Sequence, residues 1–223
     1  MGFAVGSMAL AVAGEKGFMA RKTKEEAELT RQDIIDAARC VFHECGVSRS
    51  SLEQVARVAG VTRGAVYWHF ANKAELFFAM REESLQALDT VDALLDSPDI
   101  ANPIDAIEQS LLEFFRLLEC SDVVRQVFEI MTLRCEYVNE FAPVLQEVNK
   151  PCLDYLAKLK LAYARAGEKG FLRPGLDPEA MAYDTLSFVG GLFNNWLACA
   201  PGDDLRTRVP AMIANHLALR RRF

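Results

Sequence analysis

Histidine is scarce in this chain of 223 residues: its three copies, His43, His69 and His216, are each isolated in sequence from an obvious Ser, Cys or acidic partner. Motifs for phosphate loops, dinucleotide binding, zinc proteases and serine hydrolases are also missing. Because the sequence offers neither a nucleophile–base pair nor a cofactor loop, we expect no enzymatic activity and no cofactor.

Cysteine pairs at metal-ligand spacing are absent as well. The six cysteines are scattered along the chain, and none belongs to a Cys-x-x-Cys pair. Neither a zinc site nor a disulfide framework fits this distribution, which suits a protein of the reducing cytoplasm. The positions are Cys40, Cys45, Cys120, Cys135, Cys152 and Cys199.

Strand patterns and long apolar runs are missing too. Alternating runs of Val, Ile and Thr bounded by turn residues do not occur. Hydrophobic residues make up 51% of the chain, but no uninterrupted apolar run reaches the roughly 18 residues of a membrane-spanning helix. The sequence therefore predicts an all-α protein without a membrane span, long enough for one or two domains.

Residues 1–18 contain a short apolar stretch, from Phe3 to Ala13. No Lys or Arg precedes it, although a secretory signal begins with a basic segment. A basic arm containing Arg21, Lys22 and Lys24 follows instead. We therefore expect residues 1–20 to be a disordered or non-native extension.

The most informative segment that the chain does contain is residues 62–70, Thr-Arg-Gly-Ala-Val-Tyr-Trp-His-Phe. Thr62 is a suitable N-cap for a short helix. Val66 and Phe70 are four residues apart and are expected in the core. Because four aromatic residues stand in a row, at least two of them must point outward. Exposed aromatic side chains beside Arg63 are typical of a surface that contacts DNA.

A second short helix precedes this segment. Ser50 and Glu53 fit a capping box with Ser50 as the N-cap, and the helix is expected over 52–59. Gly60 supplies the backbone freedom of a tight turn. Two short helices joined by such a turn describe a helix-turn-helix, whose second helix enters the major groove. Amphipathic spacing over 34–45 predicts one more helix ahead of both.

The runs TRGAVYWHF (62–70) and NKAEL (72–76) resemble the DNA-binding domain of the TetR family of transcriptional repressors. The resemblance implies an N-terminal three-helix DNA-binding domain over residues 21–80. It also implies a C-terminal helical domain over residues 81–223 that binds ligand and dimerises. The segment MARKTKEEAELTR (19–31) is similar to the start of the subgroup that represses multidrug efflux pumps of the resistance-nodulation-division kind.

The expected DNA contacts gather at helix ends. Arg63 is placed to read a guanine edge or to hold a phosphate, and Lys73 to reach a phosphate beside the groove. Trp68 either packs beneath the recognition helix or lies against the DNA backbone. The resemblance adds Thr30 on the first helix. The full set is Thr30, Ser50, Ser51, Thr62, Arg63, Gly64, Ala65, Tyr67, Trp68, His69 and Lys73.

Charge is divided unevenly along the chain. Residues 19–73 carry nine Lys/Arg and seven Asp/Glu, whereas residues 74–223 carry 15 and 23. The net charge of −6 therefore conceals a basic head on an acidic body. An acidic protein can bind DNA when its positive charge is gathered on one face. A purely architectural DNA binder is disfavoured, because such proteins are basic throughout.

Caps and prolines divide the body into helices. A long connecting helix is expected from Lys73 to Leu95. Pro151 is expected to kink or break a later helix, and Pro210 to bend or restart the last one. The other helices are expected over about 102–119, 121–136, 141–166 and 177–199, and from 203 or 204 onward.

The helix ending near Cys199 is apolar on more than one face, and Gly190–Gly191 permits close approach of a neighbouring backbone. A helix that is apolar on two faces needs two partners. The resemblance implies that the second partner is another subunit, in a homodimer formed through the last two helices. Such a dimer reads a palindromic operator on double-stranded DNA.

The middle helices are rich in large apolar side chains, which form either a plain core or a ligand pocket. The resemblance favours a roomy pocket for a small hydrophobic effector, and such pockets suit several ligands. Glu129, Thr132 and Tyr155 are candidates to orient the ligand, and Leu118 and Met131 share the apolar character of the group. The expected lining is Ile107, Leu111, Phe114, Phe128, Thr132, Tyr155, Leu159, Leu186 and Val189.

These features together indicate a cytoplasmic, ligand-responsive repressor of a multidrug efflux operon. The effector is expected to tilt the helix over 73–95 and thereby to change the spacing of the two DNA-binding heads. Two alternatives remain open. One is a TetR-like regulator of lipid metabolism, catabolism or cell–cell signalling. The other is redox sensing through the thiol of Cys135 or Cys152.

Overall fold

The computed structural model describes residues 23–222, so the expectations for residues 1–20, Arg21 and Lys22 lie outside the described residues. The regular secondary structure of the described part is helical apart from one isolated antiparallel bridge, and the predicted all-α fold is confirmed. None of its helices is long and apolar enough to cross a membrane. The elements are α1 (Lys24–Cys45), α2 (Leu52–Val58), α3 (Arg63–His69), α4 (Lys73–Leu85), η1 (Gln86–Leu88), α5 (Asp89–Leu95), α6 (Pro103–Cys120), α7 (Asp122–Leu133), η2 (Asn139–Phe141), α8 (Val144–Glu168), α9 (Pro178–Ala198) and α10 (Asp204–Ala218).

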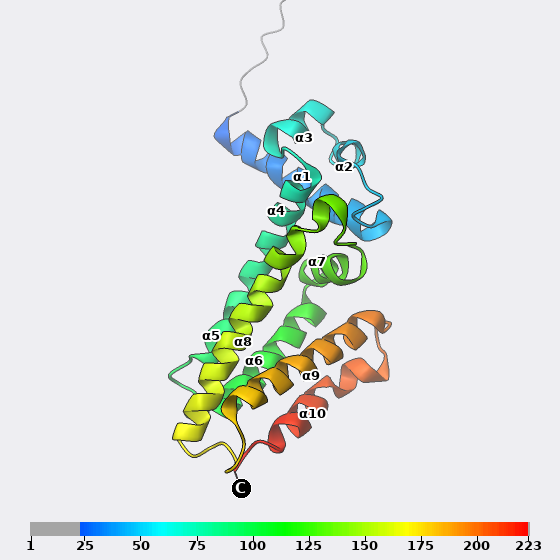
Figure 1. Cartoon of the computed structure of the whole chain (residues 1–223). Coiled ribbons are helices and arrows are strands. Elements are labelled where there is room, and N and C mark those ends of the chain that lie inside the picture. Colours follow the sequence, from blue (N-terminus) through cyan, green and yellow to red (C-terminus); the bar gives the residue numbers. More distant parts are fainter. Residues whose placement is uncertain (1–22, 223) are drawn as a thin grey trace, which may run out of the picture.

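Helices α1, α2 and α3 form a compact unit at one end of the molecule, and α4 runs from it into the body (Figure 1). The expected cap of α3 is confirmed, because Thr62 Oγ1 accepts a hydrogen bond from the Ala65 amide at 3.2 Å. The expected cap of α2 was wrong by one residue. Ser51 rather than Ser50 is the N-cap, and its partner in the capping box is Gln54.

The single helix expected from Lys73 to Leu95 is wrong. Helix α4 ends at Leu85, a 3₁₀ turn follows, and α5 begins at Asp89. At this break the Asp89 amide donates to the Gln86 carbonyl three residues earlier, which is the backbone spacing of a 3₁₀ turn. The break contains neither Gly nor Pro, so ordinary helix-stop signals could not reveal it.

Helix α8 begins at Val144, because residues 139–141 form a separate 3₁₀ turn, and it continues through Pro151 without a break. A proline at position 151 has no amide hydrogen to donate to the Glu147 carbonyl four residues earlier. The guanidinium of Arg81 on α4 takes over that role, since its Nη2 donates to Glu147 O at 2.7 Å. A side chain of α4 thus replaces the backbone hydrogen bond that Pro151 removes from α8. Pro210 likewise lies inside α10.

Two hydrophobic cores share helix α7. Val127 and Ile130 are buried with residues of α1 to α4, whereas Val124 is buried with residues of the body. Phe128 packs against both cores. Figure 1 shows α7 beneath the α1–α3 unit, at its junction with the body. A displacement of α7 therefore changes the packing of both the DNA-binding unit and the body.

Candidate DNA-binding surface and ligand pocket

The outward face of α3 carries the side chains that the sequence singled out. Trp68 is 73% exposed and Tyr67 is 44% exposed, whereas Val66 and Phe70 are buried as expected. Of the two interpretations of Trp68, packing beneath the helix is thus excluded. Large exposed aromatic side chains on a short helix form a surface that is available to a partner.

Arg63 at the start of α3 is held in place by two neighbours. Its Nε lies 3.0 Å from Glu53 Oε1 on α2, and its Nη2 donates to the Tyr67 hydroxyl at 3.4 Å. The guanidinium also lies over the Tyr67 ring, 5.2 Å from its centroid. The hydrogen bond to Tyr67 and the charge of Glu53 raise the pKa of Arg63. The exposed Gly64 beside it leaves room for close backbone approach.

Three of the expected DNA contacts have hydroxyl or ammonium groups bonded within the unit. The Thr30 hydroxyl donates to Glu26 O at 2.8 Å, and the buried Ser50 hydroxyl donates to Val47 O at 2.7 Å. Lys73 Nζ donates to Val47 O at 2.9 Å and to Ser50 O at 3.3 Å. The contacts of Ser50 and Lys73 brace the loop between α1 and α2.

The remaining expected contacts lie close to α3. His69 is half-buried, and its ring meets Trp68 edge-on at 4.5 Å between centroids. Ser51 caps α2, Ala65 is half-buried, and Thr62 is exposed at the helix start. Backbone amides at this N-terminus point outward, which favours a phosphate group.

Helix α7 is tied to α1 by polar contacts as well as by packing. His43 Nε2 on α1 lies 2.6 Å from Glu129 Oε2 on α7. Beyond the end of α7, the Arg134 carbonyl accepts a hydrogen bond of 2.9 Å from the Val47 amide. Glu129 was expected in the ligand pocket, but the structure uses it in this link between the two parts of the chain.

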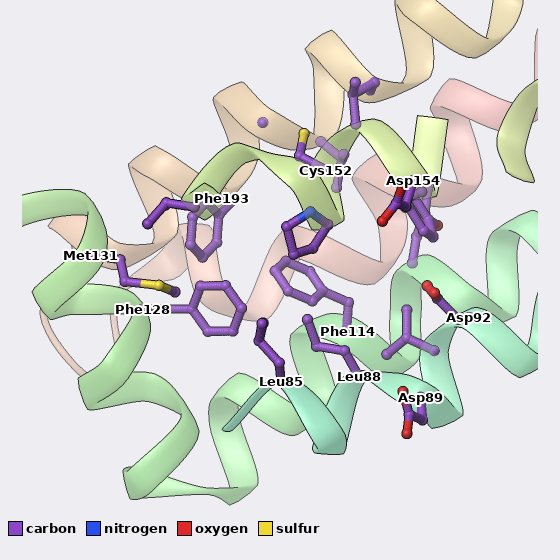
Figure 2. Close-up of a pocket in the computed structure, with 18 of the residues that line it drawn as sticks. Leu85, Leu88, Asp89, Asp92, Phe114, Phe128, Met131, Cys152, Asp154 and Phe193 are labelled. Carbon is purple, nitrogen blue, oxygen red and sulfur yellow. The ribbon is translucent and has the colours of Figure 1, made fainter. Parts of the chain in front are cut away.

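A cavity of about 380 Å³ lies in the body, enclosed by residues from α4 to α9 (Figure 2). This volume is in the usual range for small-molecule sites. Three phenylalanines from α6, α7 and α9 meet there, with ring centroids 5.5 Å to 5.7 Å apart. The expected lining residues found in the wall are Leu111, Phe114, Phe128, Tyr155, Leu186 and Val189.

Three expected lining residues are corrected by the structure. Ile107 and Leu159 are fully buried among other side chains of the core and do not reach the cavity. Thr132 is exposed near the end of α7. Apolar periodicity identifies the inward face of a helix, but it does not say which turns of that face meet another helix and which meet a cavity.

The expected lining also omits one whole wall, contributed by α4, η1, α5 and the first half of α8. These residues are Arg81, Leu85, Leu88, Asp89, Val91, Asp92, Val148, Pro151, Cys152 and Asp154, joined by Gly190 and Phe193 of α9. The pairs Leu85–Leu88 and Asp89–Asp92 have three-residue spacing, which places each pair on one helix face. That spacing is the one signal that could have identified this wall.

Tyr155 contributes to the wall and is anchored from behind. Its hydroxyl lies 2.9 Å from Ser110 Oγ, which donates to Val91 O at 2.8 Å. Burial raises the pKa of Tyr155, so the phenol is neutral at physiological pH.

Family models match both parts of the chain. Residues 34–80 match "Bacterial regulatory proteins, tetR family", and residues 102–221 match "MAATS-type transcriptional repressor, C-terminal region". The second match covers more than half of the chain. The chain belongs to the TetR family. It is a helix-turn-helix transcriptional repressor, as the resemblance at residues 62–76 implied.

Individual TetR-family relatives are similar over nearly the whole length. The HTH-type transcriptional regulator TtgR of Pseudomonas putida is 37% identical over 187 residues, which cover 84% of this chain and 89% of TtgR. The crystal structure of NalD, the secondary repressor of the MexAB-OprM multidrug efflux pump in Pseudomonas aeruginosa, has a TM-score of 0.79 and 32% identity. It covers 89% of this chain and 99% of NalD. The SmeT–triclosan complex has a TM-score of 0.74 and 30% identity, covering 87% and 92% of the two chains.

The apolar side chains on two faces of α9 in this TetR-family chain have neighbours within the chain. Leu192 and Trp196 are buried in the body core, while Leu186, Val189 and Phe193 face the cavity. The sequence pattern that suggested a dimer is thus explained within one chain. The outer side of α9 is exposed at Tyr183, Ser187, Gly191 and Asn194.

Two thiols of this TetR-family chain, Cys135 and Cys152, lie in environments that oppose their ionisation. Burial raises the pKa of Cys135 to about 11, and burial also raises the pKa of Cys152. A protonated thiol is a poor nucleophile toward oxidants. Both environments therefore disfavour the redox-sensing alternative.

Proposed function

We propose that this chain is a homodimeric repressor of a multidrug efflux operon, released from its operator when a hydrophobic drug fills the cavity of the body. The observation that carries this proposal is the position of the cavity. It lies against α4 and η1, the segment that leaves the DNA-binding unit directly after the recognition helix α3. The similarity to NalD and SmeT, both repressors of multidrug efflux pumps, supports the efflux assignment.

On DNA, α3 is proposed to enter the major groove with Arg63, Tyr67 and Trp68 facing outward. Arg63 would contact a guanine edge or a phosphate, both of which are preferred partners of a guanidinium. The amides that follow Thr62 would receive a phosphate at the start of the helix. A dimer formed through α9 and α10 would present two such helices to the two halves of a palindrome.

Two routes connect the cavity to α3. Leu85 and Leu88 line the cavity at the break between α4 and α5, so a ligand that pushes them outward tilts α4. Phe128 and Met131 line it from α7, whose Val127 and Ile130 pack against the DNA-binding unit. For a swing from 1:99 to 99:1, the ligand must favour the released state by about 5.5 kcal/mol.

The test is fluorescence anisotropy of the purified chain on its own upstream intergenic DNA, titrated with structurally varied antibiotics and dyes. We expect tight, salt-sensitive binding that several unrelated apolar drugs release. Arg63→Ala should abolish specific binding, whereas Lys169→Ala at the far end of α8 should not affect it. Tight binding that no drug loosens would leave a repressor with another effector and reject the multidrug proposal.

A further inference from the structure

The DNA-binding unit carries an acidic side chain at a helix start that would otherwise attract a phosphate. Glu53 is the second residue of α2, directly after Leu52, and its side chain is 48% exposed. A hydrogen bond from its own backbone amide and the charge of Arg63 lower the pKa of Glu53, so the carboxylate is ionised at neutral pH. This negative charge repels the phosphate that the amides of a helix start would attract. The start of α2 is therefore a poor phosphate site.

The same carboxylate occupies only one part of the Arg63 guanidinium. Arg63 Nε lies 3.0 Å from Glu53 Oε1, and Nη2 donates one hydrogen to the Tyr67 hydroxyl. A guanidinium has five N–H groups, and two are taken. The other three, on the two terminal nitrogens, have no acceptor among residues 23–222. Because the Arg63 side chain is 63% exposed, it can bind an acceptor outside the chain without leaving Glu53.

The charge of this pair determines which acceptor on DNA suits it. Arg63 and Glu53 together are neutral, so an approaching phosphate is attracted by the guanidinium and repelled by the carboxylate beside it. The O6 and N7 atoms of guanine carry no net charge, and they accept two N–H groups from one guanidinium. A guanine edge therefore gains both hydrogen bonds with little repulsion. A phosphate contact would instead leave the Glu53 carboxylate unpaired beside the DNA backbone.

We propose that Glu53 is a specificity-determining residue of operator recognition, which reserves Arg63 for a guanine edge and withholds it from phosphates. The inference rests on the proposed entry of α3 into the major groove, and it names the base that Arg63 reads. Tyr67 assists, because its ring and its hydroxyl both contact the guanidinium. Non-specific DNA binding is driven by phosphates. Glu53 therefore weakens non-specific binding and leaves the contact with guanine intact.

Two labelled duplexes of equal length separate the two kinds of contact in anisotropy titrations of the full chain. One is the operator fragment, and the other is an alternating adenine–thymine duplex, which has phosphates but no guanine. We expect Glu53→Gln, which keeps the shape of the side chain, to raise affinity for the guanine-free duplex about fivefold. The salt slope of that binding should steepen by about one, because Arg63 gains a phosphate. Affinity for the operator should change by no more than about twofold.

Two controls test whether the gain depends on Arg63. In an Arg63→Ala background, Glu53→Gln should change affinity for the guanine-free duplex by less than about twofold. Glu44→Gln removes the same charge from an exposed position near the end of α1, and its effect should be equally small. Unchanged affinity in Glu53→Gln, or an equal gain in the Arg63→Ala background, would overturn the inference.

Interference by 7-deazaguanine tests the base that is read, because this analogue lacks the N7 acceptor. For the parent chain, the substitution should lower binding at one guanine in each half of the operator. Arg63→Lys keeps the charge but not the paired N–H groups, so interference at that guanine should be lost. Interference at no guanine, or interference that persists in Arg63→Lys, would overturn the assignment of guanine.

The proposed function fails in different ways from this inference. If the parent chain did not bind its upstream DNA specifically, the proposed repressor function would be rejected, and the reading of a guanine with it. If no drug released the chain, only the multidrug effector would be rejected, because no drug enters the assays of Glu53. Specific operator binding without any effect of Glu53→Gln on the guanine-free duplex would reject the inference alone.

Discussion

The bond between Arg81 and Glu147 exists because Pro151 leaves a carbonyl without its helical donor. We therefore predict that the effect of removing Arg81 depends on whether residue 151 is proline. With Pro151 present, Arg81→Met removes the side-chain donor of this carbonyl. With Pro151→Ala, the restored amide supplies the bond from within α8, and Arg81 becomes partly redundant.

The magnitudes follow from the chemistry of this one carbonyl. A hydrogen bond from a charged donor contributes about 1.5–3 kcal/mol. Water reaches the partly exposed Glu147 once Arg81 is gone, so we expect a cost of about 2 kcal/mol for Arg81→Met beside Pro151. Beside alanine the cost should fall to about 1 kcal/mol, a coupling of about 1 kcal/mol between the two sites. Pro151→Ala alone should be stabilising, because it restores a hydrogen bond in the helix interior.

The assay is urea unfolding of the four proteins at one protein concentration, followed by circular dichroism. Arg165→Met provides the matched control, since Arg165 Nη2 also donates to a backbone carbonyl, that of Leu95, at 2.5 Å. That carbonyl does not depend on Pro151, so the control pair should be additive within about 0.5 kcal/mol. Additive costs for Arg81→Met and Pro151→Ala would refute the reasoning.

Four further predictions concern separate parts of the chain. Lys73→Met should lower the unfolding free energy by about 2 kcal/mol because the Val47 and Ser50 carbonyls both lose a charged donor, and Val47 O keeps only the donors of Ser50. The salt slope of operator binding should remain unchanged, whereas a phosphate contact would lower it by about one. Peroxide should not release the parent chain from its operator, because the Cys135 thiol stays protonated at neutral pH. Cys135→Ser should behave in the same way. Release of the parent chain by peroxide, but not of the variant, would contradict this prediction. Burial, assisted by Arg220, lowers the pKa of His216 from 6.5 to about 4, so the unfolded chain binds this proton more readily. Stability should therefore decline as the pH falls from 6.5 toward 4, and His216→Phe should reduce that decline in urea midpoints. The methyl group of Gly191→Ala meets open space within one chain, so the variant should stabilise helix α9 by about 1 kcal/mol. The same methyl group should weaken the proposed dimer, measured by sedimentation at high dilution. An unaffected dimer would place the interface elsewhere.

The DNA-binding unit was largely predictable because its chemistry is local. Thr62 caps the helix that follows it, as its position in the sequence indicated. A cap satisfies backbone amides within three residues, so sequence order is enough to locate it. The error at Ser50 has the same origin, because two neighbouring serines are equally able to cap and packing decides between them.

The cavity was predictable only in part because it depends on contacts between distant segments. The roles of Arg81 and Pro151 become visible only when α4 lies beside α8, 66 residues away in the sequence. The same holds for Asp89 and Asp154, which belong to different helices and line one cavity only because the fold brings these helices together. The apolar pattern of α9 was read correctly as two-faced, but sequence cannot distinguish a face that meets a second subunit from one that meets a cavity.

The placement of the cavity suggests why a small ligand can reset a DNA-binding head. A protein interior is close-packed, so a molecule that fills a cavity of about 380 Å³ displaces the lining helix with the weakest contacts to the rest of the protein. The wall at Leu85 and Leu88 coincides with the break between α4 and α5, where a continuous ladder of helical hydrogen bonds is lacking. The wall at Phe128 belongs to α7, whose other face is part of the core of the DNA-binding unit. A displacement of α4 or of α7 is therefore transmitted to the DNA-binding unit that carries α3. Because these helices are closely packed, we expect the unit to adopt two discrete positions rather than to move gradually.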